Sequence, residues 1–260
     1  MGDGTPSYIN EKYIKELLEN LKRKLENNET KFENIEITIE VNPGTVTKEK
    51  LELYKNCGIN RLSIGLQSAQ NSLLKEIGRI HTLKEFLETY KIAKEVKFDN
   101  INVDLMIGLP KQSIQDIKKS LELLIKLDPT HISVYSLIVE EGSLVLPEED
   151  LERRMYWYVK DYLELHGYDQ YEISNFSKKG HESKHNLNCW NQKEYIGFGI
   201  AAHSYIKNIR FGNIENIEKY IENIEAEKLE SNRNIEEKQT KEEQEKEFMM
   251  LGFRKIQGVN

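Results

Sequence analysis

Two periodicities of hydrophobic residues alternate along the chain from residue 10 to residue 166. Short apolar runs rich in β-branched residues indicate buried strands, and apolar residues recurring every three or four positions indicate helices. We predict strands at 36–41, 61–65, 101–106 and 131–137. We predict helices at 10–26, 47–57 and 82–96, from residue 113, and at 148–166. Capping-box spacings at Thr82-x-x-Glu85 and Ser113-x-x-Asp116 support two of these helix starts.

Strands that alternate with helices predict a parallel sheet with right-handed crossovers. Four such strands are too few to close an eight-stranded barrel of about 250 residues. We therefore expect an α/β fold, either a partial (β/α) barrel or an open sheet.

The pattern changes after residue 166. Residues 168–177 form an aromatic, strand-like segment, and 195–205 place small residues beside apolar ones, which suits close backbone packing. Residues 213–244 are predicted as a pair of solvated, charged helices, after which apolar residues return. We expect three parts: a partial barrel at 1–175, a histidine-containing strand region at 176–212, and a charged helical segment at 213–260 that leads into the start of a C-terminal domain.

Polar residues stand at or beyond the carboxyl ends of successive predicted strands. A carboxylate inside a core strand is unfavourable unless something binds it, and ligands of parallel α/β folds collect at the strands' carboxyl ends. Carboxylates and an amide suit hydroxyl and ammonium groups, and an arginine suits a carboxylate, so a small zwitterion bearing a ribose would fit. Each carboxylate alone could be structural, and the arginine alone could lie on the surface. The candidates are Gly4, Thr5, Glu40, Gln67, Arg79 and Asp104.

A second group of candidates follows the predicted barrel. His181, His185 and Cys189 recur every four residues, a spacing that on a helix would put them on one face and could ligate zinc or haem iron. Gly180, three asparagines and the lack of apolar periodicity argue against a helix, so zinc is disfavoured. His203 is expected to be a core histidine.

Composition narrows the class of protein. The formal net charge is −7 in 260 residues, so the average charge shows no nucleic-acid-binding footprint. No apolar run approaches the roughly 18 residues of a membrane span, and we see no signal peptide. The two cysteines, Cys57 and Cys189, lie too far apart in the sequence for a disulfide framework or a metal motif, which predicts a reducing cytoplasm.

The chain resembles the radical S-adenosylmethionine (SAM) family, in the branch of oxygen-independent coproporphyrinogen III oxidase and the haem chaperone HemW. Five motifs match in order and spacing, and His185-Asn-Leu-Asn-Cys189-Trp190 resembles the His-Asn-x-x-Tyr-Trp haem motif, with Cys189 in the tyrosine position. The five motifs are Gly2-Asp-Gly-Thr-Pro6, Glu40-Val-Asn-Pro43, Ser63-Ile-Gly-Leu-Gln-Ser68, Gly78-Arg-Ile-His81 and Asp104-Leu-Met-Ile-Gly-Leu-Pro110.

This resemblance implies a radical-SAM barrel lacking its first strand and a set of ligands. Glu40, Gln67, Arg79 and Asp104 would hold SAM, with Arg79 on its methionine carboxylate. Backbone groups of Gly4 and Thr5 would bind the amino group of SAM's methionine part. Asp3, which replaces a family glycine, would crowd or repel the carboxylate of SAM. His185 is the first candidate axial haem ligand and His203 the second.

The family's Cys-x-x-x-Cys-x-x-Cys segment, which binds a [4Fe-4S] cluster, does not occur in the chain. Neither Cys57 nor Cys189 can substitute, so we expect no reductive SAM cleavage from the chain as given, and the cluster only in a full-length parent. The favoured explanation is a fragment of a longer gene product, also cut at its carboxyl end. The other is a natural cluster-less derivative.

The resemblance favours a HemW-like haem chaperone that transfers haem to an acceptor protein of the respiratory chain. One alternative is an enzyme that carries out the oxidative decarboxylation of coproporphyrinogen III. Another is a cluster-less remnant that only binds SAM or a tetrapyrrole.

Overall fold

The computed structural model describes residues 1–2, 4–26, 32, 35–137 and 148–259. Within these residues the chain forms two compact units, Met1–Glu182 and Ser183–Asn260. The boundary falls seven positions beyond the end of the predicted barrel at 175, and the finer three-part division stays a prediction. Each unit is described by itself.

The first unit is built on a six-stranded sheet with the order β1-β2-β3-β4-β6-β5. The four strands β1 to β4 are parallel, which confirms the predicted parallel arrangement. The strand-like segment predicted at 168–177 is instead two antiparallel strands, because Ser174 turns the chain and donates its backbone N–H to Glu172 Oε1 (2.9 Å). The strands are β1 (Thr38–Val41), β2 (Arg61–Gln67), β3 (Asn100–Ile107), β4 (His131–Ser136), β5 (Asp169–Glu172) and β6 (Asn175–Ser177).

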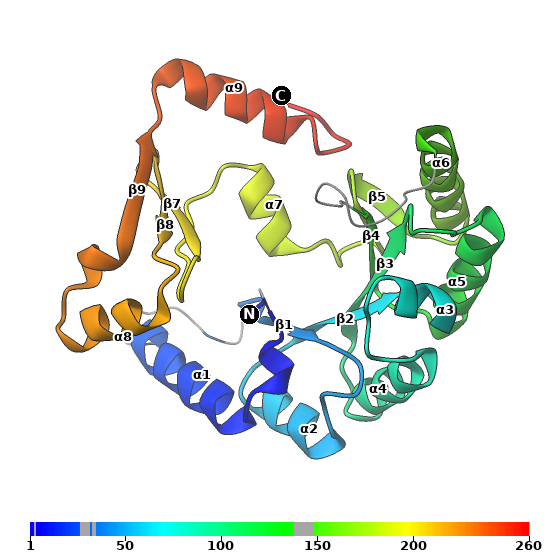
Figure 1. The fold of residues 1–260 in the computed structure, drawn as a ribbon, viewed down its shortest axis with the longest axis horizontal. Coiled ribbons are helices and arrows are strands. Elements are labelled where there is room, and N and C mark those ends of the chain that lie inside the picture. Colours follow the sequence, from blue (N-terminus) through cyan, green and yellow to red (C-terminus); the bar gives the residue numbers. More distant parts are fainter. Residues whose placement is uncertain (3, 27–31, 33–34, 138–147, 260) are drawn as a thin grey trace. The chain divides into compact units, whose positions relative to one another are not determined.

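Helices cover the outer face of this sheet (Figure 1). Thr82 and Ser113 each close the capping box that their spacing predicts. A short helix, α3, was not predicted, because its six residues are too few to show an apolar period. The helices are α1 (Glu11–Glu26), α2 (Lys48–Asn56), α3 (Asn71–Glu76), α4 (Leu83–Glu95), α5 (Ile114–Leu127) and α6 (Glu149–Leu165), and a 3-10 turn precedes them at Pro6–Tyr8.

The two faces of the parallel sheet differ sharply in polarity. Side chains alternate between the faces of a strand, and the outward set is apolar and packs in one core with the helices, as Ile64 and Val103 do. The inward set is polar and includes Ser63, Asn102 and Asp104, in contrast to the branched apolar residues that fill an ordinary barrel. The inner face is therefore suited to polar ligands.

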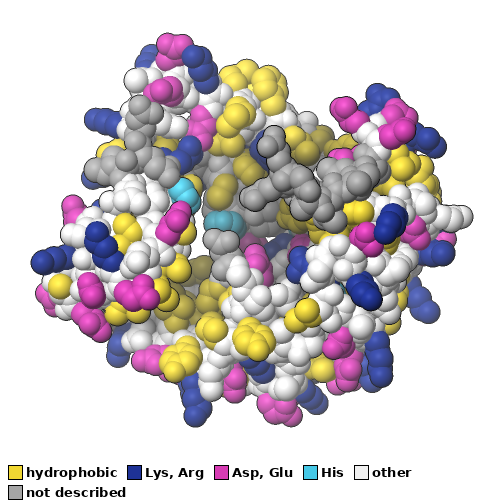
Figure 2. Space-filling model, viewed as in Figure 1, with side chains coloured by type: hydrophobic (Ala, Val, Ile, Leu, Met, Phe, Trp, Pro, Cys, Tyr) yellow, Lys and Arg dark blue, Asp and Glu magenta, His cyan; other side chains and the backbone are white. Residues whose placement is uncertain are grey.

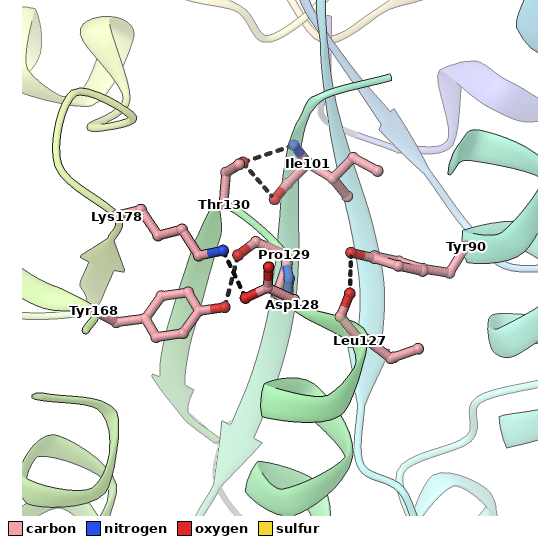
Figure 3. A network of polar contacts seen from close by, with 8 residues as sticks. All are labelled: Tyr90, Ile101, Leu127, Asp128, Pro129, Thr130, Tyr168 and Lys178. Carbon is pink, nitrogen blue, oxygen red and sulfur yellow. Dashed lines mark hydrogen bonds and ion pairs between the residues drawn. The ribbon is translucent and has the colours of Figure 1, made fainter. Parts of the chain in front are cut away.

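Contacts with side chains hold the turn between α5 and β4 (Figure 3). The hydroxyls of Tyr90 and Tyr168 donate to backbone carbonyls of this turn at 3.0 and 2.7 Å, and Lys178 pairs with Asp128 at 2.6 Å. Thr130 Oγ1 accepts from the backbone N–H at the start of the neighbouring β3 (2.9 Å). The contacts tie together the amino ends of β3 and β4, at the opposite end of the sheet from the candidate residues.

Leu121 provides a test of the core. It lies on α5 and is fully buried against the sheet. Leu121→Ala is expected to lower the free energy of unfolding by about 3 kcal/mol, because a buried leucine leaves a cavity when it is truncated. Chemical denaturation measures this loss, with the exposed Lys119→Ala on the same helix as the control. Equal stabilities of the two variants would contradict the placement of α5.

The second unit contains a three-stranded antiparallel sheet of order β7-β8-β9. None of the helices in the described parts of either unit is long and apolar enough to cross a membrane. The elements of the second unit are α7 (Lys184–Trp190), β7 (His203–Ile206), β8 (Ile209–Asn213), α8 (Ile217–Glu225), a 3-10 turn at Leu229–Asn232, β9 (Arg233–Lys238) and α9 (Lys241–Gly252).

Three predictions for this unit were wrong. The charged helix pair at 213–244 is not formed, because β9 occupies its second half and pairs with β8. A helix, α7, does form where none was expected, and Ser183 caps it by accepting from the backbone N–H of Asn186 (3.3 Å). His203 is exposed and is not a core histidine.

The close backbone packing predicted for 195–205 is present. A Cβ at Gly197 would overlap the backbone carbonyl oxygen of His203, so only glycine allows this approach. The segment thus lies directly against β7.

Charged side chains of both signs are mixed over the face shown in Figure 2. In the first unit, opposite charges also pair one helical turn apart, as do Lys15–Glu19 on α1 (3.7 Å) and Lys91–Glu95 on α4 (3.8 Å). Exposed pairs of this kind contribute about 0–1 kcal/mol each. The charges on that face are spread out and form no block of one sign.

Candidate functional site

A polar cavity of about 430 Å³ lies at the carboxyl ends of β1, β2 and β3 in the first unit. Its lining includes all six candidates that the sequence places in this unit: Gly4, Thr5, Glu40, Gln67, Arg79 and Asp104. The lining also includes five residues that were not candidates, although the first four belong to two of the quoted motifs: Val41, Asn42, Ser63, Gly65 and Tyr135. Asp3 lies outside the described residues.

The opening segment of the chain lies against the end of β1. The Thr5 hydroxyl accepts from Asn42 Nδ2 (2.7 Å), and the backbone N–H of Glu40 donates to the carbonyl of Met1 (3.0 Å). A Cβ at Gly2 would overlap the Glu40 carboxylate, so the backbone at Gly2 lies close against this side chain. These contacts bring Gly4 and Thr5 to the same cavity as the strand residues.

Asp104 projects from the inner face of β3 into this cavity. Its Oδ1 accepts from Asn102 Nδ2 at 2.8 Å, and its Oδ2 has a longer contact from the Ser63 hydroxyl at 3.4 Å. Burial raises the pKa of Asp104 to about 6, although the Asn102 hydrogen bond lowers it, and the nearby charge of Glu40 raises it further. Asp104 is therefore ionised at neutral pH in a site where its charge is costly.

Gln67 ends β2 in a strained backbone conformation. Its φ is 63°, in the left-handed region that few residues other than glycine adopt, and the pairing of β2 with β3 shifts between Gly65 and Gln67. A Cβ at Gly65 would lie 2.8 Å from Gln67 Nε2, so the amide folds over that glycine. Strain of this kind costs about 1–3 kcal/mol and is concentrated at binding sites.

Arg79 reaches the cavity from the loop after α3. It is half-buried, and its guanidinium has no hydrogen-bond or ion-pair partner within the described part of the chain. Burial lowers the pKa of the neighbouring His81, and the positive charge of Arg79 adds to this effect. The guanidinium is available to pair with a carboxylate from a ligand.

Together the described residues that line the cavity give it one cation, two carboxylates, two amides and several hydroxyls. Asp104 and Glu40 accept hydrogen bonds from hydroxyl or ammonium groups, and Arg79 donates to a carboxylate. The arrangement complements a zwitterionic ligand that also carries hydroxyl groups.

The second set of candidates is only partly brought together. α7 places His185 and Cys189 one turn apart, with Sγ 3.9 Å from Nε2, but His181 precedes this helix and lies in the first unit. No group of three or more histidine, cysteine or acidic side chains in the described ranges could hold a metal ion. Burial raises the pKa of the Cys57 and Cys189 thiols, which disfavours the thiolate that metals require.

A strip of apolar side chains begins six residues after α7. Ile196, Phe198 and Ile200 alternate with small residues and are exposed, Phe198 by 80%. Side chains on the opposite edge hold this extended segment: Asn213 Nδ2 donates to the Gly199 carbonyl (2.7 Å), and the Gly199 N–H donates to the Tyr220 hydroxyl (3.1 Å). The strip thus supplies three exposed apolar side chains in the same unit as His185 and His203.

Comparisons with known proteins identify the class first. Residues 1–124 match the model of the radical SAM superfamily. The fold resembles coproporphyrinogen III oxidase (HemN) from Escherichia coli, a radical SAM enzyme, with a TM-score of 0.76 at 21% identity over 94% of this chain and 60% of that one. This likeness confirms the predicted radical-SAM barrel fold.

Sequence similarity then identifies the family. The chain is 41% identical to the heme chaperone HemW of Bacillus subtilis over 270 aligned residues, covering all of this chain and 70% of that protein. It is 33% identical to the heme chaperone HemW of Haemophilus influenzae, covering all of this chain and 68% of that protein. The chain belongs to the HemW family.

Proposed function

We propose that the chain works as a HemW-type haem chaperone, which binds SAM in the first unit and haem in the second and passes the haem to an acceptor protein. The observation that carries the SAM part is the convergence of all six sequence-predicted residues on one polar cavity. The haem part rests on family membership and on the exposed histidine of α7. The acceptor that we propose is a haem protein of the respiratory chain.

The donor set of the cavity fits SAM. Arg79 would pair with the methionine carboxylate, and backbone groups of Gly4 and Thr5 would serve its amino end. Glu40 and Asp104 would accept hydrogen bonds from the ammonium group and the ribose hydroxyls. The side-chain amide of Gln67 would supply further hydrogen-bond donors and acceptors. The strained backbone of Gln67 would set the direction in which this amide points.

A [4Fe-4S] cluster does not fit the residues of this chain. Such a cluster takes about four ligands, mostly cysteine thiolates, and the chain has two cysteines, one in each unit. We therefore assign no SAM cleavage to these residues, and their role toward SAM is binding.

For haem, His185 is the proposed axial ligand and His203 the second candidate. Both imidazoles are exposed, and neutral imidazole is a common ligand of haem iron. The His185 Nε2 contact with Cys189 would have to open if that nitrogen were to bind iron. The apolar strip of Ile196, Phe198 and Ile200 offers a surface for the macrocycle.

Oxidative decarboxylation of coproporphyrinogen III remains the second candidate function. Its support is the likeness to HemN, and at 21% identity this likeness concerns the fold. Formation of a porphyrin product from coproporphyrinogen III under anaerobic conditions by a cluster-loaded, full-length protein would favour it over the chaperone function.

Binding of SAM by the purified chain tests the first half of the proposal. We expect isothermal titration calorimetry to show saturable one-to-one binding. Arg79→Met is expected to weaken it about tenfold or more, because a charge-assisted bidentate contact contributes about 1.5–3 kcal/mol.

The matched control for this experiment is Arg23→Met on α1, which removes an exposed guanidinium outside the cavity lining. The control should bind SAM as the unmodified chain does. Absence of heat with the unmodified chain would overturn the SAM-binding proposal, and equal affinities of the two variants would remove Arg79 from the site.

A further inference from the structure

Beneath the cavity, side chains from β2, β3, β4 and β5 form a continuous hydrogen-bonded row. The Tyr171 hydroxyl contacts His131 Nε2 (2.8 Å), and His131 Nδ1 contacts Asn102 Oδ1 (2.6 Å). On its other side, Asn102 Nδ2 donates both to Ser63 Oγ (2.8 Å) and to Asp104 Oδ1 (2.8 Å). The row thus ends at the carboxylate that lines the cavity.

The chemistry of its members fixes the direction of every hydrogen bond in this row. Burial lowers the pKa of His131 well below its usual value, so its imidazole is neutral and carries one proton. An ionised Asp104 only accepts, so the Asn102 amide must turn its NH₂ toward Asp104 and its oxygen toward His131. His131 then donates from Nδ1 and accepts the Tyr171 hydroxyl proton at Nε2.

We infer that Asn102 is a positioning residue of the SAM site, which holds Oδ1 of Asp104 and keeps this carboxylate ionised, so that Oδ2 accepts from the ligand. The inference rests on the SAM-binding function proposed above. Oδ2 is able to accept a hydrogen bond from the ligand because its present contact with the Ser63 hydroxyl, at 3.4 Å, is weak.

The other charges around Asp104 make this support necessary. Glu40 on β1 repels its charge, and Arg61 on β2 attracts it. Arg61 is only 5% exposed, and its Nε has no hydrogen-bond partner among the described residues. Its effect on the pKa of Asp104 comes from its positive charge. Among the influences that lower the pKa of Asp104, the hydrogen bond from Asn102 is the strongest.

The remaining titratable neighbours lie farther along the same face. Tyr135 on β4 has its pKa raised by burial, and the charges of Asp104 and of Glu172 on β5 add to this. Burial lowers the pKa of His131 and keeps it neutral, and the positive charge of Arg61 adds to this. Among these groups only Asn102 contacts Asp104 directly at normal hydrogen-bond distance.

The test compares SAM affinity as a function of pH for three variants of the whole chain. Asn102→Ala should weaken SAM binding about tenfold at pH 7, because it removes a hydrogen bond to a charged group. The midpoint of the pH dependence should move upward, and the affinity should recover at alkaline pH, where Asp104 is ionised without help. A residue that only supported the fold would lower the affinity at every pH.

Ser63→Ala is the milder variant. It removes the long contact to Asp104 Oδ2 and one acceptor of the Asn102 amide, but it leaves the hydrogen bond from Asn102 to Asp104 Oδ1 in place, so it should give a smaller shift in the same direction. Asn100→Ala is the matched control, since Asn100 lies on the same strand and its side chain accepts from Thr130 (3.2 Å) and not from the cavity residues. An Asn102→Ala protein that is folded and has the unmodified midpoint would overturn the inference.

A second measurement separates failure of this inference from failure of the proposed function. Carbon-13 NMR of labelled aspartate carboxyl groups, assigned with Asp104→Asn, gives the pKa of Asp104 in the absence of SAM. A raised pKa in Asn102→Ala supports the action of Asn102 on Asp104 even if the unmodified chain binds no SAM. An unchanged pKa overturns it, whatever the affinity for SAM.

Discussion

Replacing Asp104 with asparagine is expected to weaken SAM binding about 100-fold, the largest loss of affinity that we predict for a single substitution in the cavity. Asparagine has nearly the same shape but no charge, so the ligand loses a charge-assisted acceptor. The carbonyl oxygen of the new amide can still accept from Asn102 Nδ2, which donates to Asp104 Oδ1 at 2.8 Å. The NH₂ group then takes the place of Oδ2, so a donor replaces the acceptor that we assign to the ligand.

The pH dependence of the affinity gives this prediction a second signature. Because the pKa of Asp104 is raised to about 6, the carboxylate is ionised above that pH and neutral below it. SAM affinity should therefore be full at pH 7–8 and fall as the pH drops through about 6. Asp104→Asn should remove this step. Calorimetric titrations at several pH values measure both effects.

The matched control is Asp99→Asn, an identical change at an exposed residue just before β3. It should leave both the affinity and its pH dependence unchanged. Full SAM affinity in Asp104→Asn would show that Asp104 is a structural carboxylate, the alternative that the sequence leaves open.

Replacing His185 with alanine is expected to abolish the shift of the Soret band that haem produces on binding to the chain. The shift reports a nitrogen ligand on the iron, and His185 is exposed on α7, where its imidazole is accessible. The loss should be complete in the absorption spectrum even if the apolar strip of Ile196, Phe198 and Ile200 retains some haem.

Two other histidines serve as comparisons. His203→Ala tests the second candidate ligand and should leave the Soret shift in place if His185 is the axial ligand. His166→Ala is the matched control, since this exposed histidine stacks on Tyr162 in the first unit. An unchanged spectrum in His185→Ala, together with a lost shift in His203→Ala, would transfer the role to His203.

The cavity candidates could be predicted because their positions depend on strand periodicity. Glu40 and Asp104 are carboxylates that interrupt apolar strands, and Gln67 ends one, so each stands out locally. Parallel pairing then brings the ends of adjacent strands to one edge of the sheet, as it does for β1 to β3. The local pattern and the parallel connection of the strands were enough to predict that Glu40, Gln67 and Asp104 lie at one site.

The polar residues around these candidates could not be predicted in this way. Asn102 is an ordinary polar residue in sequence, and Ser63 belongs to a family motif that does not mark it as a ligand. The importance of both comes from the register that pairs them across β2 and β3. Tyr135 reaches the same cavity from β4, whose order in the sheet is a property of the tertiary fold. The sequence around each residue does not show which side chains of other strands will lie beside it.

The sequence by itself determined the longer helices and the parallel strands of the first unit and the polar residues at its strand ends, because both follow from hydrophobic periodicity. Tertiary structure alone decided β9, whose charged sequence becomes a strand through pairing with β8. It also decided the exposure of His203 and the hydrogen bonds beneath Asp104. The physical reason is that strand pairing, burial and pKa depend on neighbours distant in sequence, whereas helix caps and apolar periods depend on residues nearby.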